Sequence, residues 1–129
     1  MSAADRLEGA AIRSHNLAEA DTLRIGGVPV VARDIAAVSA ADFRWLRCDL
    51  KVTSLLANCL LRQMAIDAGC IETLLFRDGY LTEASASNVW VVHEGAVLGP
   101  PKSEHVLEGI RYDLIRELCE ETGIACSEV

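Results

Sequence analysis

The chain has 129 residues, a hydrophobic content of 51% and a formal net charge of −7 at pH 7. These values are typical of one modest globular domain that can bury a core. The acidic charge argues against nucleic acid and anionic membrane as partners, because binding to either depends on basic patches. The longest uncharged runs, 52–61 and 84–93, have ten residues each, whereas a transmembrane helix needs about twenty apolar residues.

Two further classes are disfavoured by the pattern of residues. The five cysteines form no C-x-x-C pair and do not lie near histidines at zinc-ligand spacing, so we expect neither a bound metal nor a disulfide framework. The N-terminus has no basic region followed by an apolar stretch, and no secretory signal is visible. The cytoplasm is therefore the expected location.

The first part of the chain gives weak signals up to a clear helix. Residues 1–27 are rich in alanine and charge and are poorly readable as structure. Residues 28–33 are expected to form a strand, whereas 35–41 are ambiguous between a short helix and a loop. Thr53 or Ser54 can cap a helix that Gly69 is placed to end. Because that helix is apolar nearly all round, we expect it to be buried between layers.

The second part alternates strands and turns before a second helix. Residues 71–77 read as a strand, and Asp78-Gly79 predicts a tight hairpin into a return strand. Residues 88–93 form the next expected strand, and Glu94-Gly95 turns it into 96–98. An amphipathic helix then runs from Gly109 to Gly123, and a strand follows. The predicted class is α+β, an antiparallel meander with packed helices.

Lys51 is the first candidate for chemistry. It is one of two lysines and lies immediately before the first helical pattern. An amine attacks a carbonyl only when it is unprotonated, and burial by Trp45 and Leu50 with the charge of Arg47 would favour that form. The alternative is an ordinary exposed surface lysine.

Three features occur in order along the chain: Lys51, the string 81–90 that contains Glu83, and Gly109-Ile110 at a helix start. A phosphorylated pyridine aldehyde needs a lysine for its carbonyl, a carboxylate for its ring nitrogen and helix N-terminal amides for its phosphate. Alone, Glu83 is typical of a solvated loop carboxylate, and Gly109 of any helix start. The combination points to one cofactor.

At these residues the chain resembles the class IV aminotransferases, the fold-type IV family that depends on pyridoxal 5'-phosphate, and most closely the D-amino acid transaminases. The likeness covers 28–129, which would form part of the large, cofactor-binding pseudo-barrel lobe. It implies that Lys51 carries the cofactor as a Schiff base and that Glu83 faces the pyridine nitrogen. The other implied cofactor-binding residues are Ser85 and Ser87 in the loop, Leu107 behind the ring, and Gly109 and Ile110 at the phosphate. Arg111 would either bind the phosphate or be a solvated arginine.

The resemblance also implies an activity and leaves alternatives open. The expected reaction converts an amino acid to its 2-oxo acid, with Lys51 moving the proton, in a homodimer. An aminodeoxychorismate lyase or a branched-chain aminotransferase would use the same scaffold. Family members have a further small lobe that is not recognisable here, so an inactive fragment or non-catalytic binding remnant is the remaining alternative. A partial lobe would leave apolar surface uncovered. Gly99 also departs from the family, in which a threonine is usual before the proline.

Overall fold

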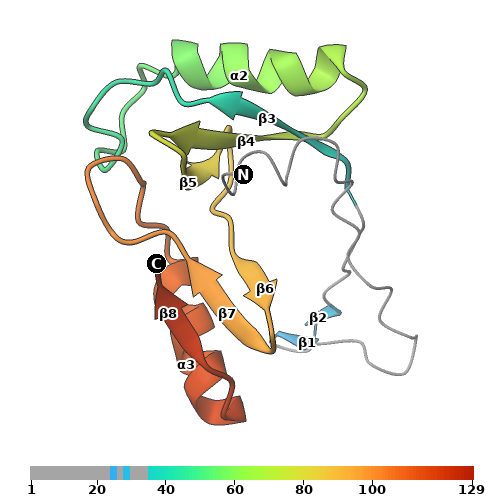
Figure 1. The fold of residues 1–129 in the computed structure, drawn as a ribbon, viewed down its shortest axis with the longest axis vertical. Coiled ribbons are helices and arrows are strands. Elements are labelled where there is room, and N and C mark those ends of the chain that lie inside the picture. The colour runs from blue at the N-terminus through green and yellow to red at the C-terminus, as the bar shows by residue number, and fades with distance from the viewer. Residues whose placement is uncertain (1–23, 26–27, 30–34) are drawn as a thin grey trace.

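The computed structural model describes residues 24–25, 28–29 and 35–129 (Figure 1). Two layered units follow one another along this part of the chain, each made of a three-stranded sheet and one helix. The elements of the first unit are β3 (Ala37–Ala41), α2 (Leu56–Asp67), β4 (Glu72–Arg77) and β5 (Tyr80–Ala84). Those of the second are β6 (Val91–His93), β7 (Ala96–Gly99), α3 (Arg111–Thr122) and β8 (Cys126–Glu128).

In the first unit, α2 lies along one face of the sheet (Figure 1). Strand β3 pairs parallel with β4, and β4 pairs antiparallel with β5. The helix connects the two parallel strands, as a crossover between parallel strands requires. Leu61 and Ala65 of α2 and Leu75 of β4 are fully buried, each with 0% exposure. The hydroxyl of Thr73 donates a hydrogen bond to the Leu61 carbonyl at 2.6 Å, which ties the helix to the sheet.

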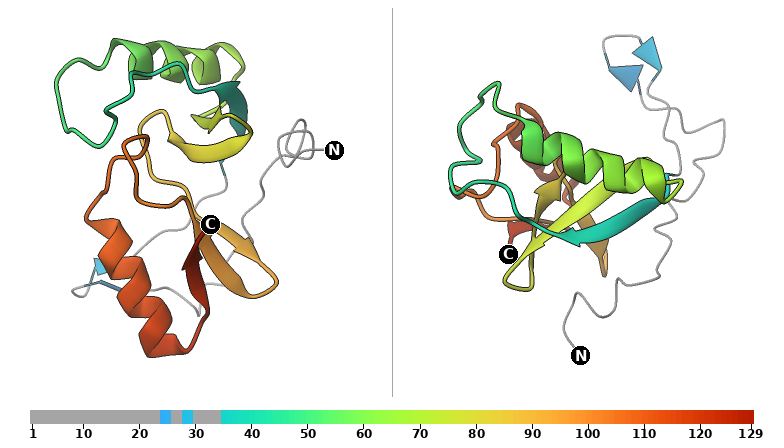
Figure 2. Two further views of the ribbon diagram at one scale, coloured as in Figure 1. Left: turned by 60° about the vertical axis from the view of Figure 1, so that its left-hand side comes forward. Right: turned by 90° about the horizontal axis from the view of Figure 1, so that it is seen from above.

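The second unit has the same parts in the opposite order along the chain, with the hairpin before the helical crossover. Strands β6 and β7 pair antiparallel, β7 pairs parallel with β8, and α3 connects these last two strands (Figure 2). The predicted α+β class is thus confirmed, but the single antiparallel meander is wrong, because β5 and β6 lie in different sheets. The chain leaves the first sheet where the Ala84 amide donates to the Ser87 carbonyl at 2.8 Å. That tight turn uses backbone groups that a continuing ladder would need.

Both hairpin turns follow their predicted chemistry. Asp78 and Gly79 have φ of 52° and 84°, and Glu94 and Gly95 have φ of 49° and 79°. Two successive positive φ values match the right-handed twist of the flanking strands, and glycine adopts such values at little cost.

Several element predictions need correction. Residues 35–41, expected as a helix or loop, contain strand β3, because pairing with β4 decides their conformation. Helix α2 starts from Leu55 without a side-chain cap, so neither Thr53 nor Ser54 caps it. Of the predicted strand 28–33, the structure describes only β2 (Val28–Pro29), which pairs with β1 (Arg24–Ile25); the remainder lies outside the described residues.

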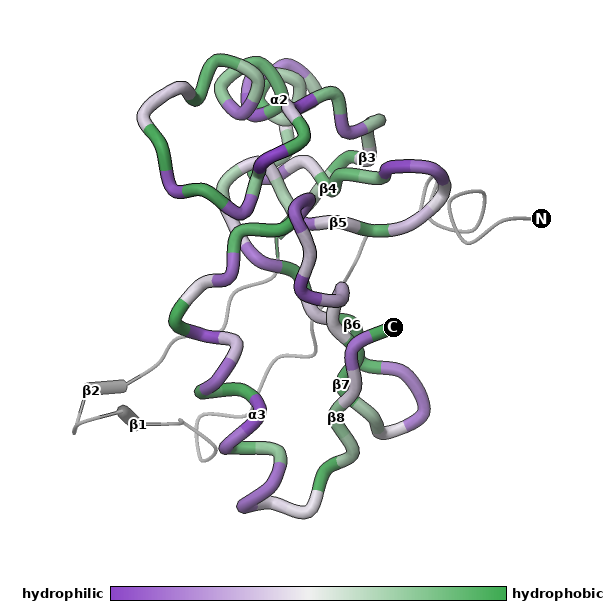
Figure 3. Tube along the Cα trace, turned by 90° about the vertical axis from the view of Figure 1, so that its left-hand side faces the viewer, coloured by the Kyte–Doolittle hydropathy of each residue, from purple (hydrophilic) through white to green (hydrophobic). Residues whose placement is uncertain are grey.

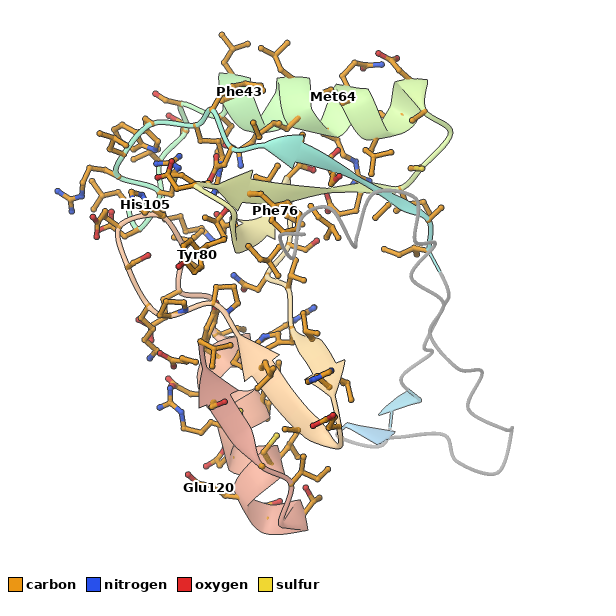
Figure 4. The ribbon with its side chains drawn as sticks, viewed as in Figure 1. Phe43, Met64, Phe76, Tyr80, His105 and Glu120 are labelled. Carbon is orange, nitrogen blue, oxygen red and sulfur yellow. The ribbon has the colours of Figure 1, made fainter. Side chains whose placement is uncertain are left out.

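The outer side of α2 differs from the expectation of burial between layers. Side chains there project away from the sheet (Figure 4), and Leu56 is 73% exposed. The other exposed large apolar side chains at this helix are Leu55, Leu60, Met64 and Ile66. The described residues therefore cover one face of α2 and leave the other open, as expected for a partial lobe.

Helix α3 alternates polar and apolar residues along its length (Figure 3). It ends at Gly123, whose φ of 71° provides the left-handed C-cap that the sequence predicted. Only Tyr112 and Cys119 of this helix are buried, whereas Leu114 and Leu118, apolar residues of the predicted amphipathic helix, are exposed. Neither helix of the described ranges has the length and hydropathy needed to cross a membrane.

Gly99, where the family that the sequence resembles usually has a threonine, lies against an indole ring. A Cβ built on Gly99 would be 2.5 Å from the ring of Trp90. Trp90 also packs against buried Tyr112, with ring centroids 4.8 Å apart, so the indole has little room to move. The larger Trp90 side chain thus fills the space that a side chain at position 99 would use.

We expect Gly99→Thr to lower the free energy of unfolding by about 1–3 kcal/mol, because overpacking a filled site forces side chains from their rotamers. Urea unfolding measures this change. Adding Trp90→Leu to Gly99→Thr should recover part of the loss by making room for the threonine. A double variant no more stable than Gly99→Thr alone would contradict the overlap.

Candidate functional site

A cavity of about 580 Å³ opens between α2, the segment that carries Lys51 and the segment that follows β5. This volume is in the range of small-molecule sites, about 300–1,000 Å³. Six of the predicted site residues line it, namely Lys51, Glu83, Ser85, Ser87, Leu107 and Gly109. Two do not: Ile110 is 94% exposed, and Arg111 is also exposed. The structure therefore brings together residues from three separate stretches of sequence.

Glu83 is the buried acid of this cavity. It is near the end of β5 and is 6% exposed. One carboxylate oxygen accepts a hydrogen bond from Arg44 Nη1, and the other accepts the Leu107 amide at 3.1 Å. Burial raises the pKa of Glu83 above its ordinary value, and the opposing effect of Arg44 is smaller. A cationic group entering from the cavity would therefore favour the ionised form.

Arg44 is the residue that fixes Glu83, and it is itself fixed by Asp42. The Nε and Nη2 atoms of Arg44 donate to the two oxygens of Asp42 at 2.9 and 2.8 Å. Thr82 Oγ1 donates to Asp42 Oδ2 at 2.9 Å. Burial alone would raise the pKa of Asp42, but the hydrogen bonds and charge of Arg44 outweigh it and lower this pKa to about 2. The group Asp42, Arg44 and Glu83 is hereafter called the buried triad.

The roles of Asp42 and Arg44 were not predicted from the sequence. Their signal was an acid and a base two residues apart, which on extended backbone lie on the same side. An acid and a base at this spacing are common on protein surfaces. The pair becomes informative only once Glu83 is known to contact Arg44.

Asp42 predicts a loss of stability in acid, whereas the raised pKa of Glu83 acts in the opposite direction. The pKa of Asp42 is lowered from 3.8 to about 2 in the folded chain, so the unfolded chain binds its proton first as pH falls. The stabilisation is fully present above pH 4 and is lost as pH falls toward 2, by about 2 kcal/mol. Urea unfolding across this range measures the slope. In Asp42→Asn the slope should be shallower, and an unchanged slope would contradict the assignment.

Lys51 faces the cavity from an exposed position. Its expected shielding is not provided by the described residues, since Trp45 and Leu50 are themselves exposed, at 49% and 44%. Arg47, the expected neighbouring cation, donates instead to Asp49 at 2.9 and 2.8 Å. The environment that the sequence suggested around Lys51 is thus absent from the described part of the chain.

The two serines of the loop are oriented by a second buried acid. The hydroxyls of Ser85 and Ser87 both donate to the carboxylate of Glu72, the latter at 3.0 Å. Their side-chain hydrogen bonds are therefore made inside the protein rather than toward the cavity. Nothing in the sequence around Glu72 indicated this contact, because an acidic residue at the start of a strand is usually solvated.

Gly109 lies where the chain enters α3. A Cβ at this position would be 2.5 Å from Oδ1 of Asn88, and Asn88 Nδ2 donates to the Leu107 carbonyl at 2.9 Å. Glycine therefore lets two segments approach closely at the cavity wall. The adjacent N-terminal turn of α3 has amides without partners in the helix, a general anion-binding arrangement.

Comparison with known proteins agrees with this geometry. The profile of the amino-transferase class IV family matches residues 10–129. The chain is 39% identical over 94 residues to a D-alanine aminotransferase of Bacillus licheniformis, covering 73% of this chain and 33% of that protein. The chain belongs to the class IV aminotransferase family. It spans about a third of the length of this curated relative.

Solved structures show the same fold. A fold IV-transaminase of Curtobacterium pusillum matches with a TM-score of 0.67 and 22% identity, over 74% of this chain and 35% of that chain. The T.th. branched-chain amino acid aminotransferase matches with a TM-score of 0.60 and 25% identity, over 70% of this chain and 32% of that chain. The latter was solved in complex with N-(5'-phosphopyridoxyl)-L-glutamate.

Proposed function

We propose that the chain forms part of the cofactor-binding lobe of a pyridoxal 5'-phosphate-dependent aminotransferase that acts on D-amino acids. The observation that carries the proposal is that Lys51, Glu83 and Gly109 line one cavity although they are far apart in sequence. The D-alanine aminotransferase relative supports the D-amino acid. The phosphopyridoxyl adduct in the branched-chain aminotransferase structure supports the cofactor.

The donor set fits the cofactor. Lys51 Nζ is the amine available for its carbonyl, and Leu107 supplies apolar surface for its ring. Glu83, held by Arg44, would accept a hydrogen bond from the ring nitrogen. Gly109 would offer its own backbone amide to the phosphate, because it lines the cavity and Ile110 and Arg111 do not. Ser85 and Ser87 would then shape the site through their backbone, because their hydroxyls are bound by Glu72.

These residues divide the work of transamination. When bound, pyridoxal 5'-phosphate supplies an electron sink for the α-carbon of the substrate. Glu83 would keep a proton on the ring nitrogen by remaining ionised beside it. Lys51 Nζ, freed when the substrate amine takes its place, would remove the proton at the substrate α-carbon as a general base. Arg44 would keep the Glu83 carboxylate aimed at the ring.

The test uses the chain as it is. Titration with pyridoxal 5'-phosphate should produce a visible absorption band, and D-alanine should then discharge that band and release pyruvate. L-leucine as the better amine donor would instead indicate a branched-chain aminotransferase. Release of 4-aminobenzoate from aminodeoxychorismate would indicate the lyase. A chain that folds but gives no visible band would contradict the proposal and support a non-catalytic remnant.

The homodimer implied by the resemblance is also part of this proposal. The exposed apolar side of α2 gives the isolated chain a surface that favours association. Sedimentation equilibrium over a range of concentrations tests it, and a monomer at all concentrations would contradict it. The cytoplasmic location stays a prediction.

A further inference from the structure

The loop after Glu83 is held from behind by a buried carboxylate. Glu72 is 5% exposed and accepts hydrogen bonds from the hydroxyls of Ser85 and Ser87. It also accepts the Thr73 amide at 2.9 Å. Burial opposes ionisation, but these hydrogen bonds outweigh it and lower the pKa of Glu72. Glu72 is therefore an ionised anchor for this loop.

Helix α2 also contacts this loop directly. Asn58 Nδ2 donates to the Ser85 carbonyl at 2.9 Å. Arg62 lies four residues further along α2, hence on the same face, and its Nη1 lies 3.2 Å from Glu72 Oε2. One face of α2 thus holds both the backbone of the loop and the acid that anchors the loop.

This arrangement connects the two ends of the proposed site. Lys51 is five residues before the start of α2, and Glu83 is two residues before Ser85. The Asn58 hydrogen bond ties α2, which follows Lys51, to the loop that follows Glu83, and Arg44 adds a direct contact from the segment of Lys51 to Glu83 itself. The pyridine ring of the proposed cofactor would have to meet Lys51 at one end and Glu83 at the other. The distance between these two residues therefore matters, since small misplacements cost large factors in rate.

We propose that Asn58, Arg62 and Glu72, hereafter the latch residues, set the spacing between Lys51 and Glu83 across the cavity. The inference rests on the proposed function and deepens it. The latch residues are positioning residues, because they act through the loop and α2 and do not themselves touch the reacting atoms.

Two latch variants test the proposal by cofactor affinity. Asn58→Ala and Glu72→Gln should each weaken binding of pyridoxal 5'-phosphate about tenfold in a spectral titration, as loss of an outer-shell partner does at other sites. Their combined effect should be smaller than the product of the two, because both act on one loop. The control is Asp67→Asn, which removes an exposed negative charge from the same helix, where Asp67 accepts a hydrogen bond of 2.7 Å from Gln63, and it should leave the affinity unchanged.

A second measurement needs no cofactor. Amide hydrogen exchange at residues 84–88 should become faster in Asn58→Ala and Glu72→Gln but not in Asp67→Asn. Unchanged exchange in the latch variants would overturn the proposal, and so would faster exchange with unchanged cofactor affinity. If the parent chain binds no cofactor, the proposed function fails, and exchange still decides whether the latch holds the loop. If Glu72→Gln does not fold, Asn58→Ala on the surface of α2 provides both measurements.

Discussion

Arg44→Met is expected to lower the free energy of unfolding by about 3–5 kcal/mol. Arg44 is the only basic member of the buried triad, and its side chain is 3% exposed against 0% for Asp42 and 8% for Glu83. Removing it leaves two carboxylates close together in a medium that solvates them poorly. Arg77 Nη2 lies 3.3 Å from Asp42 Oδ1 and compensates only part of the charge.

Urea unfolding at neutral pH measures the loss in Arg44→Met. The matched control is Arg47→Met, which removes an arginine that pairs with Asp49 at the surface. Exposed pairs contribute little, so the control should unfold close to the parent. If Arg44→Met and Arg47→Met lost equal free energy of unfolding, burial would not be the reason that the triad stabilises the fold. At acid pH the free energy of unfolding of Arg44→Met should come closer to that of the parent, because protonated Asp42 carries no charge for the guanidinium to balance.

The sequence predicted best those features that local chemistry determines. Asp78-Gly79 and Glu94-Gly95 turn as expected, because positive φ is a property of the turn residues themselves. Gly123 ends α3 for the same reason. Residues 37–41 could not be assigned, because their extended conformation depends on pairing with β4, some thirty-five positions later. The parallel pairs β3–β4 and β7–β8 likewise depend on packing against α2 and α3.

The residues of the candidate site likewise fall into those that the sequence predicted and those that it did not. Lys51, Glu83 and Gly109 were found because their order along the chain resembles that of a family, and the cavity brings them together. The acids and bases behind them, such as Asp42 and Glu72, have ordinary surroundings in sequence. Their importance comes from burial and from partners distant in the chain, which a single sequence does not reveal.

Lys51→Ala is expected to abolish covalent capture of pyridoxal 5'-phosphate. The chain has two lysines, so the comparison is direct. Lys102 lies outside the cavity and pairs with Glu108 at the surface, whereas Lys51 lines the same cavity as Glu83. Borohydride reduction followed by peptide mapping locates the modified amine. The parent and Lys102→Ala should be labelled at position 51, and Lys51→Ala should lose the visible band.

Added methylamine distinguishes a lost amine from a lost site in Lys51→Ala. If the cavity still binds the cofactor through Glu83 and the start of α3, a small amine should restore part of the absorption, because only the nucleophile is missing. Rescue should fail in Glu83→Gln combined with Lys51→Ala, where the ring nitrogen also loses its carboxylate partner. Label that divides equally between Lys51 and Lys102 in the parent would show that the aldehyde reacts with lysines by exposure alone. The cavity would then have no part in selecting the amine.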